Sequence, residues 1–332
     1  MTYEYERIIA VQAVLKASKL CKEIRTSLSS EGSIEKQDKS PVTIADFGSQ
    51  AVITHEILSE FNDPIMAEED SSILRSSKGN NIKQKLLENV NRILPDLTEK
   101  QILSSLDSGK YEGDQKGRYW SLDPIDGTKG FLRGGQYAIA LALIEEGKVV
   151  VGVLGCPNLP IDIFHSDTAK GCLFIAVKGQ GTYIRSLEDD IERPIKVSDI
   201  DDPYFAIICE SIESAHSSLN DSEKIREILH IESLPIRMDS QCKYGVLARG
   251  EASIYLRIPT NILYIEKAWD HAAGWIIVNE AGGQVSDIHG NPIDFSVGTN
   301  LNENTGIVAT NGKIHSKVIE AVKKVIENSD AS

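Results

Sequence analysis

Two aspartates, Asp123 and Asp126, lie three residues apart in the stretch WSLDPIDGTKG, on either side of a proline. The order Asp, Pro, Gly is typical of a type I turn. An apolar segment over 119–122 leads into it, so both carboxylates are also expected at the end of a strand, where α/β proteins place their reactive groups. Neighbouring carboxylates repel each other unless a cation or hydrogen bonds compensate, and hard oxygen ligands suit Mg²⁺. A turn and a metal site both stay open at this point.

Three further acidic residues each have an ordinary explanation and a chemical one. Glu68 follows PIMA, a short apolar stretch that predicts a second strand end, although a solvated loop would also explain it. Asp270 precedes HAAGWIIVNEAGG, as a helix N-cap does. Asp46 stands three residues after Thr43, the spacing of a capping box. Taken together, these acids supply the parts of a phosphatase site with more than one metal ion.

Thr128 adds a hydroxyl group directly after the aspartate pair. Its hydroxyl can relay a proton to Asp46, and the backbone amides of Gly127 and Thr128 can hold phosphate oxygens. The sequence therefore favours phosphoryl chemistry at this point of the chain.

The surrounding pattern predicts the elements that must position these residues. Apolar side chains recur at helical spacing over 3–28 and again from Thr43 onward. The apolar runs over 137–144 and 148–154, separated by EEGK, predict a β-hairpin, and CLFIAVKGQGTY predicts a further strand. Residues 71–118 are polar and helix-prone, and we expect a loop-like, mobile excursion near the site.

An acidic, proline-punctuated segment over 186–203 predicts a domain boundary. We expect an N-terminal α+β domain over 1–195 with most of the metal ligands, and a C-terminal α/β domain over 196–332 with Asp270. Strands are predicted in FAIICE, ASIYLRIP and GIVAT, and a helix is predicted from about His271 to the glycines 282 and 283.

Composition excludes several classes of protein. The net charge of -14 opposes a binder of nucleic acid or of anionic membranes and is compatible with cation binding. The five cysteines are odd in number and form no CxxC pair, which argues against disulfides and structural zinc. The start of the chain has no signal-peptide pattern, and we expect a cytoplasmic protein.

The motifs DPIDGT, EED and WDHAAG, in this chain at wide separation, resemble the signature set of the inositol monophosphatase superfamily of lithium-sensitive, magnesium-dependent phosphatases. Longer stretches resemble the 3'(2'),5'-bisphosphate nucleotidases more closely than the inositol monophosphatases. These stretches are SPVTIADF, YEGDQKGRYWSLDPIDGTKGFLRG, GCPNLP, MDSQCKYG, YLRIP and EKAWDHAAG. The resemblance implies a layered α/β/α/β/α sandwich.

The resemblance also implies roles for particular residues. Two or three Mg²⁺ ions would be bound by Glu68, Asp123, the carbonyl oxygen of Ile125, Asp126 and Asp270, while Asp46 and Thr128 would activate water. Nucleotide contacts would fall on His216, Ser240, Lys243 and Arg257, with the phosphate also held at Gly127 and Thr128. Two departures matter. Ala67 stands where the family commonly has glycine, which alters the local turn without removing the Glu68 carboxylate, and Cys242 lies within the substrate-facing motif. A gap of one residue between Asp46 and Glu68 relative to the family would make Glu69 the ligand, so Glu69 is a rival to Glu68.

The expected reaction is removal of the 3'-phosphate of adenosine 3',5'-bisphosphate to give AMP, with 3'-phosphoadenylyl sulfate as a further substrate. The resemblance implies inhibition by lithium or sodium and a monomer with no nucleic-acid or membrane partner. One alternative is an inositol polyphosphate 1-phosphatase or inositol monophosphatase, which would use the same metals. Another is a non-catalytic protein that binds a nucleotide or a cation.

Overall fold

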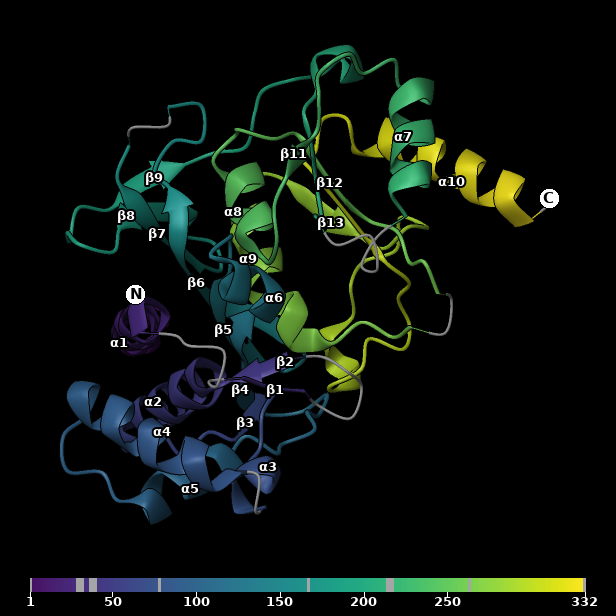
Figure 1. The fold of residues 1–332 in the computed structure, drawn as a ribbon. Helices are drawn as coiled ribbons and strands as arrows, with labels where there is room; N and C mark the ends of the chain where they lie inside the picture. The colour runs from purple at the N-terminus through teal and green to yellow at the C-terminus, as the bar shows by residue number, and fades with distance from the viewer. Residues whose placement is uncertain are drawn as a thin grey trace.

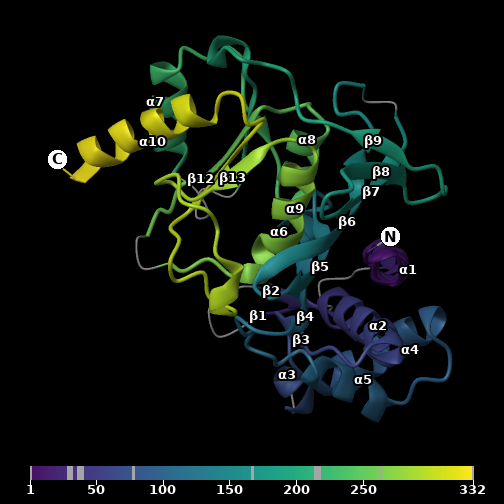
Figure 2. The same cartoon turned by 180° about the vertical axis from the view of Figure 1, so that it is seen from behind.

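The computed structural model describes residues 2–27, 33–35, 41–76, 79–165, 168–212, 218–261 and 264–330. The two larger β-sheets alternate with three layers of helices (Figure 1). Helices α1 and α2 cover one face of a seven-stranded sheet, α8 and α9 lie between this sheet and a five-stranded one, and α7 and α10 cover the far face. Seen from behind, α1 and α10 occupy opposite sides of the molecule (Figure 2). The predicted α/β/α/β/α sandwich is confirmed.

Two long helices form the first layer. The predicted helix over 3–28 is α1 (Glu4–Ser27), and the second is α2 (Ile44–Glu60) with Thr43 as its N-cap. Small side chains at Ala10, Ala13 and Ala17 are fully buried on α1, so that the helix approaches its neighbours closely. A short hairpin of β1 (Ser33–Glu35) and β2 (Pro41–Thr43) leads into α2.

The seven-stranded sheet has the order β3-β4-β5-β6-β7-β8-β9. Its strands are β3 (Ile65–Ala67), β4 (Arg118–Asp126), β5 (Ala138–Glu145), β6 (Lys148–Pro160), β7 (Lys170–Val177), β8 (Thr182–Ser186) and β9 (Arg193–Ile195). Among the described strands of this sheet, only the β3–β4 pair is parallel. The predicted hairpin is confirmed, and Glu146 and Gly147 turn it with positive φ angles of 51° and 70°. Alternate residues of β5 face the two layers of helices.

The polar excursion over 71–118 is largely helical, so its predicted helix-prone character is confirmed, whereas the expectation of a loop-like segment is wrong for most of it. It contains α3 (Ser72–Arg75), α4 (Asn80–Ile93) and α5 (Glu99–Asp107). Leu86 and Ile102 are buried and belong to the same core as α2. The few apolar residues of the excursion fall on one helical face, which is enough to pack it against α2. Its mobility stays a prediction.

The five-stranded sheet has the order β11-β10-β12-β14-β13. Its strands are β10 (Ile208–Glu210), β11 (Ile236–Arg237), β12 (Ile254–Arg257), β13 (Gln284–Ser286) and β14 (Ile307–Thr310). The accompanying helices are α7 (Leu219–Ile228), α8 (Cys242–Ala248), α9 (Ala272–Glu280) and α10 (His315–Asp330), with 3-10 turns η3 (Pro203–Phe205), η4 (Ala268–Asp270) and η5 (Phe295–Val297). The strands and the helix predicted for this half are confirmed. The domain limits 1–195 and 196–332 stay a prediction.

All five cysteines are buried as free thiols. Within the described ranges, no helix combines the length and the apolar character needed to cross a bilayer.

Candidate active site

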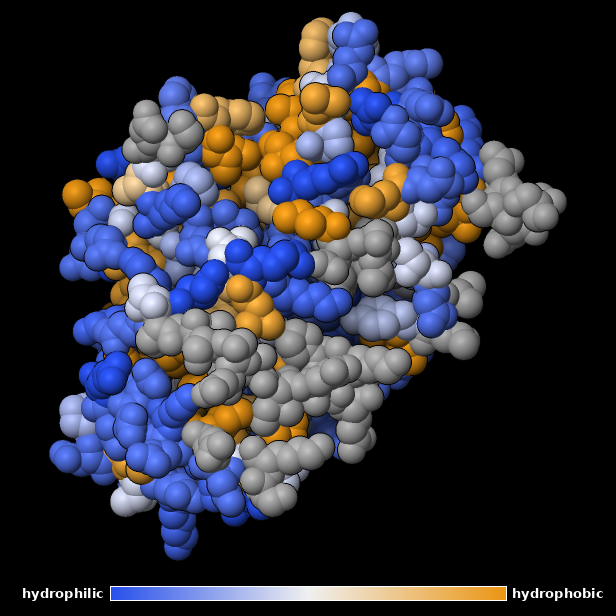
Figure 3. Space-filling view, in the orientation of Figure 1, coloured by the Kyte–Doolittle hydropathy of each residue, from blue (hydrophilic) through white to orange (hydrophobic). Residues whose placement is uncertain are grey.

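A cavity of about 280 Å³ opens between the two sheets. It is lined by the ends of β3 and β4, the start of α6 (Thr128–Arg133), the segment over 239–243 and residues of β12 and η4. On the face of the molecule shown in Figure 3, hydrophilic residues gather around the centre, where α6 lies in Figure 1. The lining includes Glu68, Asp123, Ile125, Asp126, Gly127, Thr128, Ser240, Lys243, Arg257 and Asp270, which were all predicted from the sequence.

The carboxylates in this cavity repel one another. Burial, and then the charges of Glu68 and Asp126, raise the pKa of Asp123 well above its ordinary value. Asp123 is 2% exposed, and its Oδ1 atom is buried without a hydrogen-bond partner. A buried carboxylate oxygen without a partner is costly, and a divalent cation would supply the missing interaction. The donor set, all oxygen and mostly anionic, therefore fits Mg²⁺.

Strand β4 carries both aspartates and extends to Asp126, so the type I turn alternative is wrong. Asp126 ends the strand as predicted, whereas Asp123 lies inside it. The pairing with β5 shifts its register between the two aspartates, at the proline that cannot donate a ladder hydrogen bond. This irregularity brings residues three apart in the chain, Asp123 and Asp126, to the same cavity.

The geometry favours Glu68 over its rival Glu69. Glu68 follows β3 and lines the cavity. The backbone of Glu69 is held elsewhere, because its N–H donates to Gln50 Oε1 at 3.0 Å and its carbonyl accepts from Gln50 Nε2 at 2.5 Å.

Asp46 and Thr128 form a hydrogen-bonded pair at the edge of the cavity. Thr128 Oγ1 donates to Asp46 Oδ1 at 3.1 Å and lies 3.2 Å from the carbonyl oxygen of Ile125. Asp46 Oδ2 accepts from the N–H and the hydroxyl of Thr43, at 2.8 and 2.6 Å. The capping box of α2 therefore orients the carboxylate toward Thr128. Gly127 is the N-cap of α6 and has a φ of 85°, a left-handed conformation that favours glycine there.

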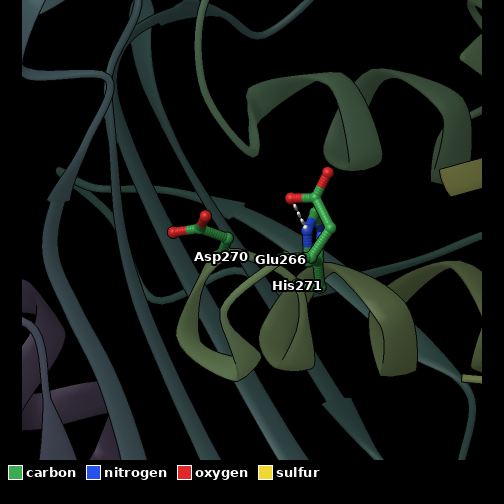
Figure 4. Close-up of side chains that lie close together, drawn as sticks. All are labelled: Glu266, Asp270 and His271. Carbon is green, nitrogen blue, oxygen red and sulfur yellow. Dashed lines mark hydrogen bonds and ion pairs between the residues drawn. The ribbon is translucent and has the colours of Figure 1, made fainter. Parts of the chain in front are cut away.

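Asp270 ends η4 and is not the N-cap of α9, because His271 takes that position. Asp270 lies beside a buried network of Glu266, His271 and Arg257, and its carboxylate points away from the Glu266–His271 pair (Figure 4). Arg257 binds both oxygens of Glu266 at 2.9 Å, and His271 Nε2 lies 3.0 Å from Glu266 Oε2.

This network serves Arg257 rather than a metal ion. Although burial opposes ionisation of Glu266, Arg257 and His271 lower its pKa to about 2. Both oxygens of Glu266 are thus occupied by positive or proton-donating partners, which leaves no free ligand for a cation. We conclude that Glu266 fixes the guanidinium group of Arg257 at the cavity wall.

Of the predicted nucleotide contacts, Ser240, Lys243 and Arg257 line the cavity, and His216 lies outside the described residues. Lys243 is 3% exposed, and burial lowers its pKa. The sequence reasoning did not single out Gln241 or Tyr255, which also line the cavity, although Gln241 belongs to the quoted motif MDSQCKYG. Tyr255 likewise belongs to the quoted stretch YLRIP, so position within these stretches was the available signal.

The chain belongs to the inositol monophosphatase family, whose model matches residues 3–327. It is 43% identical to the 3'(2'),5'-bisphosphate nucleotidase of Schizosaccharomyces pombe, over 98% of this chain and 97% of the relative. It is 45% identical to the 3'(2'),5'-bisphosphate nucleotidase of Emericella nidulans, over 98% of this chain and 100% of the relative. Its fold is similar to that of the Thermotoga maritima IMPase, with a TM-score of 0.66, 22% identity and 96% of each chain covered.

Proposed function

We propose that this chain is a magnesium-dependent phosphatase that converts adenosine 3',5'-bisphosphate to AMP and phosphate, with 3'-phosphoadenylyl sulfate as a further substrate. The observation that carries the proposal is the partnerless Oδ1 atom of buried Asp123, surrounded by acidic side chains and close to the Thr128–Asp46 pair. Relatives of 43% and 45% identity named 3'(2'),5'-bisphosphate nucleotidase support the choice of substrate.

The ligands for two or three magnesium ions would be Glu68, Asp123, the carbonyl oxygen of Ile125, Asp126 and Asp270. When bound, magnesium supplies positive charge for the phosphoryl oxygens and lowers the pKa of coordinated water. Burial, and after it the negative charges of Glu68 and Asp126, raise the pKa of Asp123, and a bound cation would oppose that effect.

Thr128 and Asp46 move the proton of the attacking water. The Thr128 hydroxyl passes its own proton to Asp46 Oδ1, 3.1 Å away, as it accepts the proton of the water. The water oxygen then forms a bond to phosphorus while the bond between phosphorus and the ribose 3'-oxygen breaks. The 3'-oxygen takes a proton from a solvent water as it leaves, the resulting hydroxide is neutralised by the proton that Asp46 returns to solvent, and the products are AMP and phosphate.

The remaining lining residues bind the substrate. Lys243 and Arg257 supply positive charge for phosphate groups, and the planar guanidinium group of Arg257, held by Glu266, can donate two parallel hydrogen bonds. The backbone amides of Gly127 and Thr128 would bind the transferred phosphate, and Ser240 and His216 would contact the nucleotide. We further propose that the protein acts as a monomer in the cytoplasm.

A panel of phosphorylated substrates, assayed with and without Mg²⁺, tests the proposal. Phosphate release from adenosine 3',5'-bisphosphate should exceed release from inositol 1,4-bisphosphate and inositol monophosphates, and it should require Mg²⁺. Faster release from the inositol phosphates would contradict the nucleotide as the substrate, but it would leave the proposed metal-dependent mechanism in place. No release from any substrate would favour the non-catalytic alternative. Lithium titrated to millimolar concentrations at fixed magnesium should inhibit, as the family resemblance implies.

A further inference from the structure

Gln241 connects two of the proposed metal ligands although it is not one of them. It is 2% exposed and directly precedes α8. Its backbone N–H donates to Asp126 Oδ2 at 2.6 Å. Its side-chain Nε2 donates to the carbonyl oxygen of Trp269 at 2.9 Å, and its Oε1 accepts from the N–H of Gly274 at 3.1 Å. Gln241 thus forms hydrogen bonds to the carboxylate of Asp126 and to the backbone on either side of Asp270, at Trp269 and Gly274.

The backbone around Gln241 packs closely against the turn that follows Asp126. Ser240 adopts a φ of 68°, a left-handed conformation that is uncommon for a residue with a side chain. A Cβ atom added to Gly127 would lie 3.0 Å from Ser240 Cβ, so the two backbones are in close contact. Asp239 also binds Arg133 of α6 at 2.7 Å. A shift of Gln241 would therefore be transmitted directly to the Asp126 carboxylate.

The side chain of Gln241 makes the connection to the other half of the site. Asp126 comes from the seven-stranded sheet, whereas Asp270 comes from η4, which precedes α9 in the layer between the sheets. The short amide arm bridges these elements with both of its polar groups satisfied. Such a bridge fixes geometry, because a buried amide that loses either partner leaves an unpaired polar group.

We propose that Gln241 is a positioning residue that sets the separation between the carboxylates of Asp126 and Asp270, and thereby the affinity for Mg²⁺. The inference rests on the metal site of the proposed function and not on the identity of the substrate. It predicts that loss of the amide weakens magnesium binding even when no substrate is present.

The test compares wild-type protein with Gln241→Met, which keeps the length of the side chain and removes both polar groups. Mg²⁺ binding is measured by isothermal titration calorimetry on the substrate-free protein, and circular dichroism confirms folding. Gln241→Asn, which keeps the amide and shortens the arm by one methylene, is used if the methionine variant does not fold. Asn311→Leu is the matched control. Asn311 is also a buried amide, and it donates to the carbonyl oxygens of Ser198 and Ile200; none of these three residues lines the cavity.

The dissociation constant for Mg²⁺ should rise at least tenfold in the Gln241 variant and stay within twofold of wild type in the Asn311 variant. The magnesium concentration for half-maximal activity should rise in parallel. In contrast, kcat measured at saturating magnesium should change less than this concentration does. Wild-type magnesium affinity in a folded Gln241 variant would overturn the proposal. Because calorimetry needs no turnover, a failed substrate assay would remove the proposed function and leave this test valid.

Discussion

At the residue scale, the properties of Asp123 come from its neighbours rather than from its own chemistry. A strand residue next to a proline is ordinary in a sequence, yet here its side chain is buried beside Glu68, Asp126 and Asp270. This arrangement lowers the stability of the folded, metal-free protein, because like charges repel one another in a poorly hydrated space. With magnesium bound, the same carboxylates would stabilise the folded protein instead of destabilising it.

Asp123→Asn should therefore separate stability from function. The variant should raise the melting temperature of the magnesium-free protein, abolish most of the further rise produced by Mg²⁺, and lower kcat/KM at least a hundredfold. For the wild type, magnesium at a hundred times its dissociation constant should add about 2.7 kcal/mol to the free energy of unfolding for each site. Differential scanning fluorimetry with and without Mg²⁺ measures both effects.

The control is Asp199→Asn, which removes the same charge from an exposed pair with Lys313. It should leave the response to magnesium unchanged. An Asp123 variant that responds to magnesium as the wild type does would argue against a metal at this position.

At the scale of elements, the N-terminus of α2 links helix capping to the proposed chemistry. Thr43→Val removes the hydroxyl group that binds Asp46 Oδ2 and leaves the shape of the side chain almost unchanged. Loss of the cap should cost about 1 kcal/mol of the free energy of unfolding. Because Asp46 also loses its orientation toward Thr128, kcat should fall at least tenfold. Urea unfolding and steady-state kinetics give the two numbers.

A second capping box in the same chain gives the matched control. Thr98 caps α5 and pairs with Gln101 in the same way, on the outer surface and away from the cavity lining. Thr98→Val should show a similar or smaller loss of stability with no loss of kcat. Equal kinetic effects in both variants would mean that the cap of α2 has no special relation to Asp46.

Helix α10 is attached to its sheet through a buried histidine. His315 Nε2 lies 2.9 Å from Ser286 Oγ, and Nδ1 lies 3.0 Å from Thr310 Oγ1. Burial lowers the pKa of His315 from 6.5 to about 4. The unfolded chain thus takes up a proton below pH 6.5 that the folded protein does not, so this stability is fully present above pH 6.5 and is lost as the pH falls toward 4.

His315→Gln removes this titration while it keeps a donor and an acceptor. The wild type should lose about 2 kcal/mol more than the variant between pH 7 and pH 4.5, after solvent screening reduces the full ~1.4 kcal/mol per pKa unit. Urea unfolding at a series of pH values measures the difference. Parallel stability curves for the two proteins would show that His315 does not contribute.

At the scale of the whole molecule, the middle layer of helices joins the two sheets. Gly274 of α9 permits this contact, because a Cβ atom there would lie 2.1 Å from the ring of Tyr244 on α8. Gly274→Ala should therefore lower the free energy of unfolding by about 1–3 kcal/mol. Because α8 and η4 both contribute residues to the cavity lining, activity should fall with it. Urea unfolding and the phosphatase assay measure both.

The double variant with Tyr244→Leu tests the cause. In the Gly274→Ala background, removal of the ring should restore part of the lost free energy of unfolding. The double-mutant cycle would then show a positive coupling between the two positions. Additive losses would place the strain elsewhere.

Many helices and strands of this fold could be predicted from local sequence patterns. The helices α1 and α2, the β5–β6 hairpin and the strands of the second half follow from periodicity and turn residues that act over a few positions. The helix-prone character of 71–118 was predicted, but its loop-like character was misjudged because its polar composition masks sparse apolar faces, and only their contact with α2 makes them buried. The register shift in β4 was also missed, since a local sequence cannot distinguish a turn from an irregular strand.

The sequence by itself determined the kinds of groups available: hard oxygen ligands, a hydroxyl–carboxylate pair, and motifs that resemble those of one phosphatase family. Only the tertiary structure decided which of them meet. It favours Glu68 over Glu69, places Asp123 inside a strand, commits Glu266 and His271 to Arg257, and brings Gln241 between Asp126 and Asp270. The physical reason is that residue type follows from covalent chemistry, whereas proximity and burial arise from packing between separate segments, such as those of Gln241 and Asp126, which are 115 residues apart.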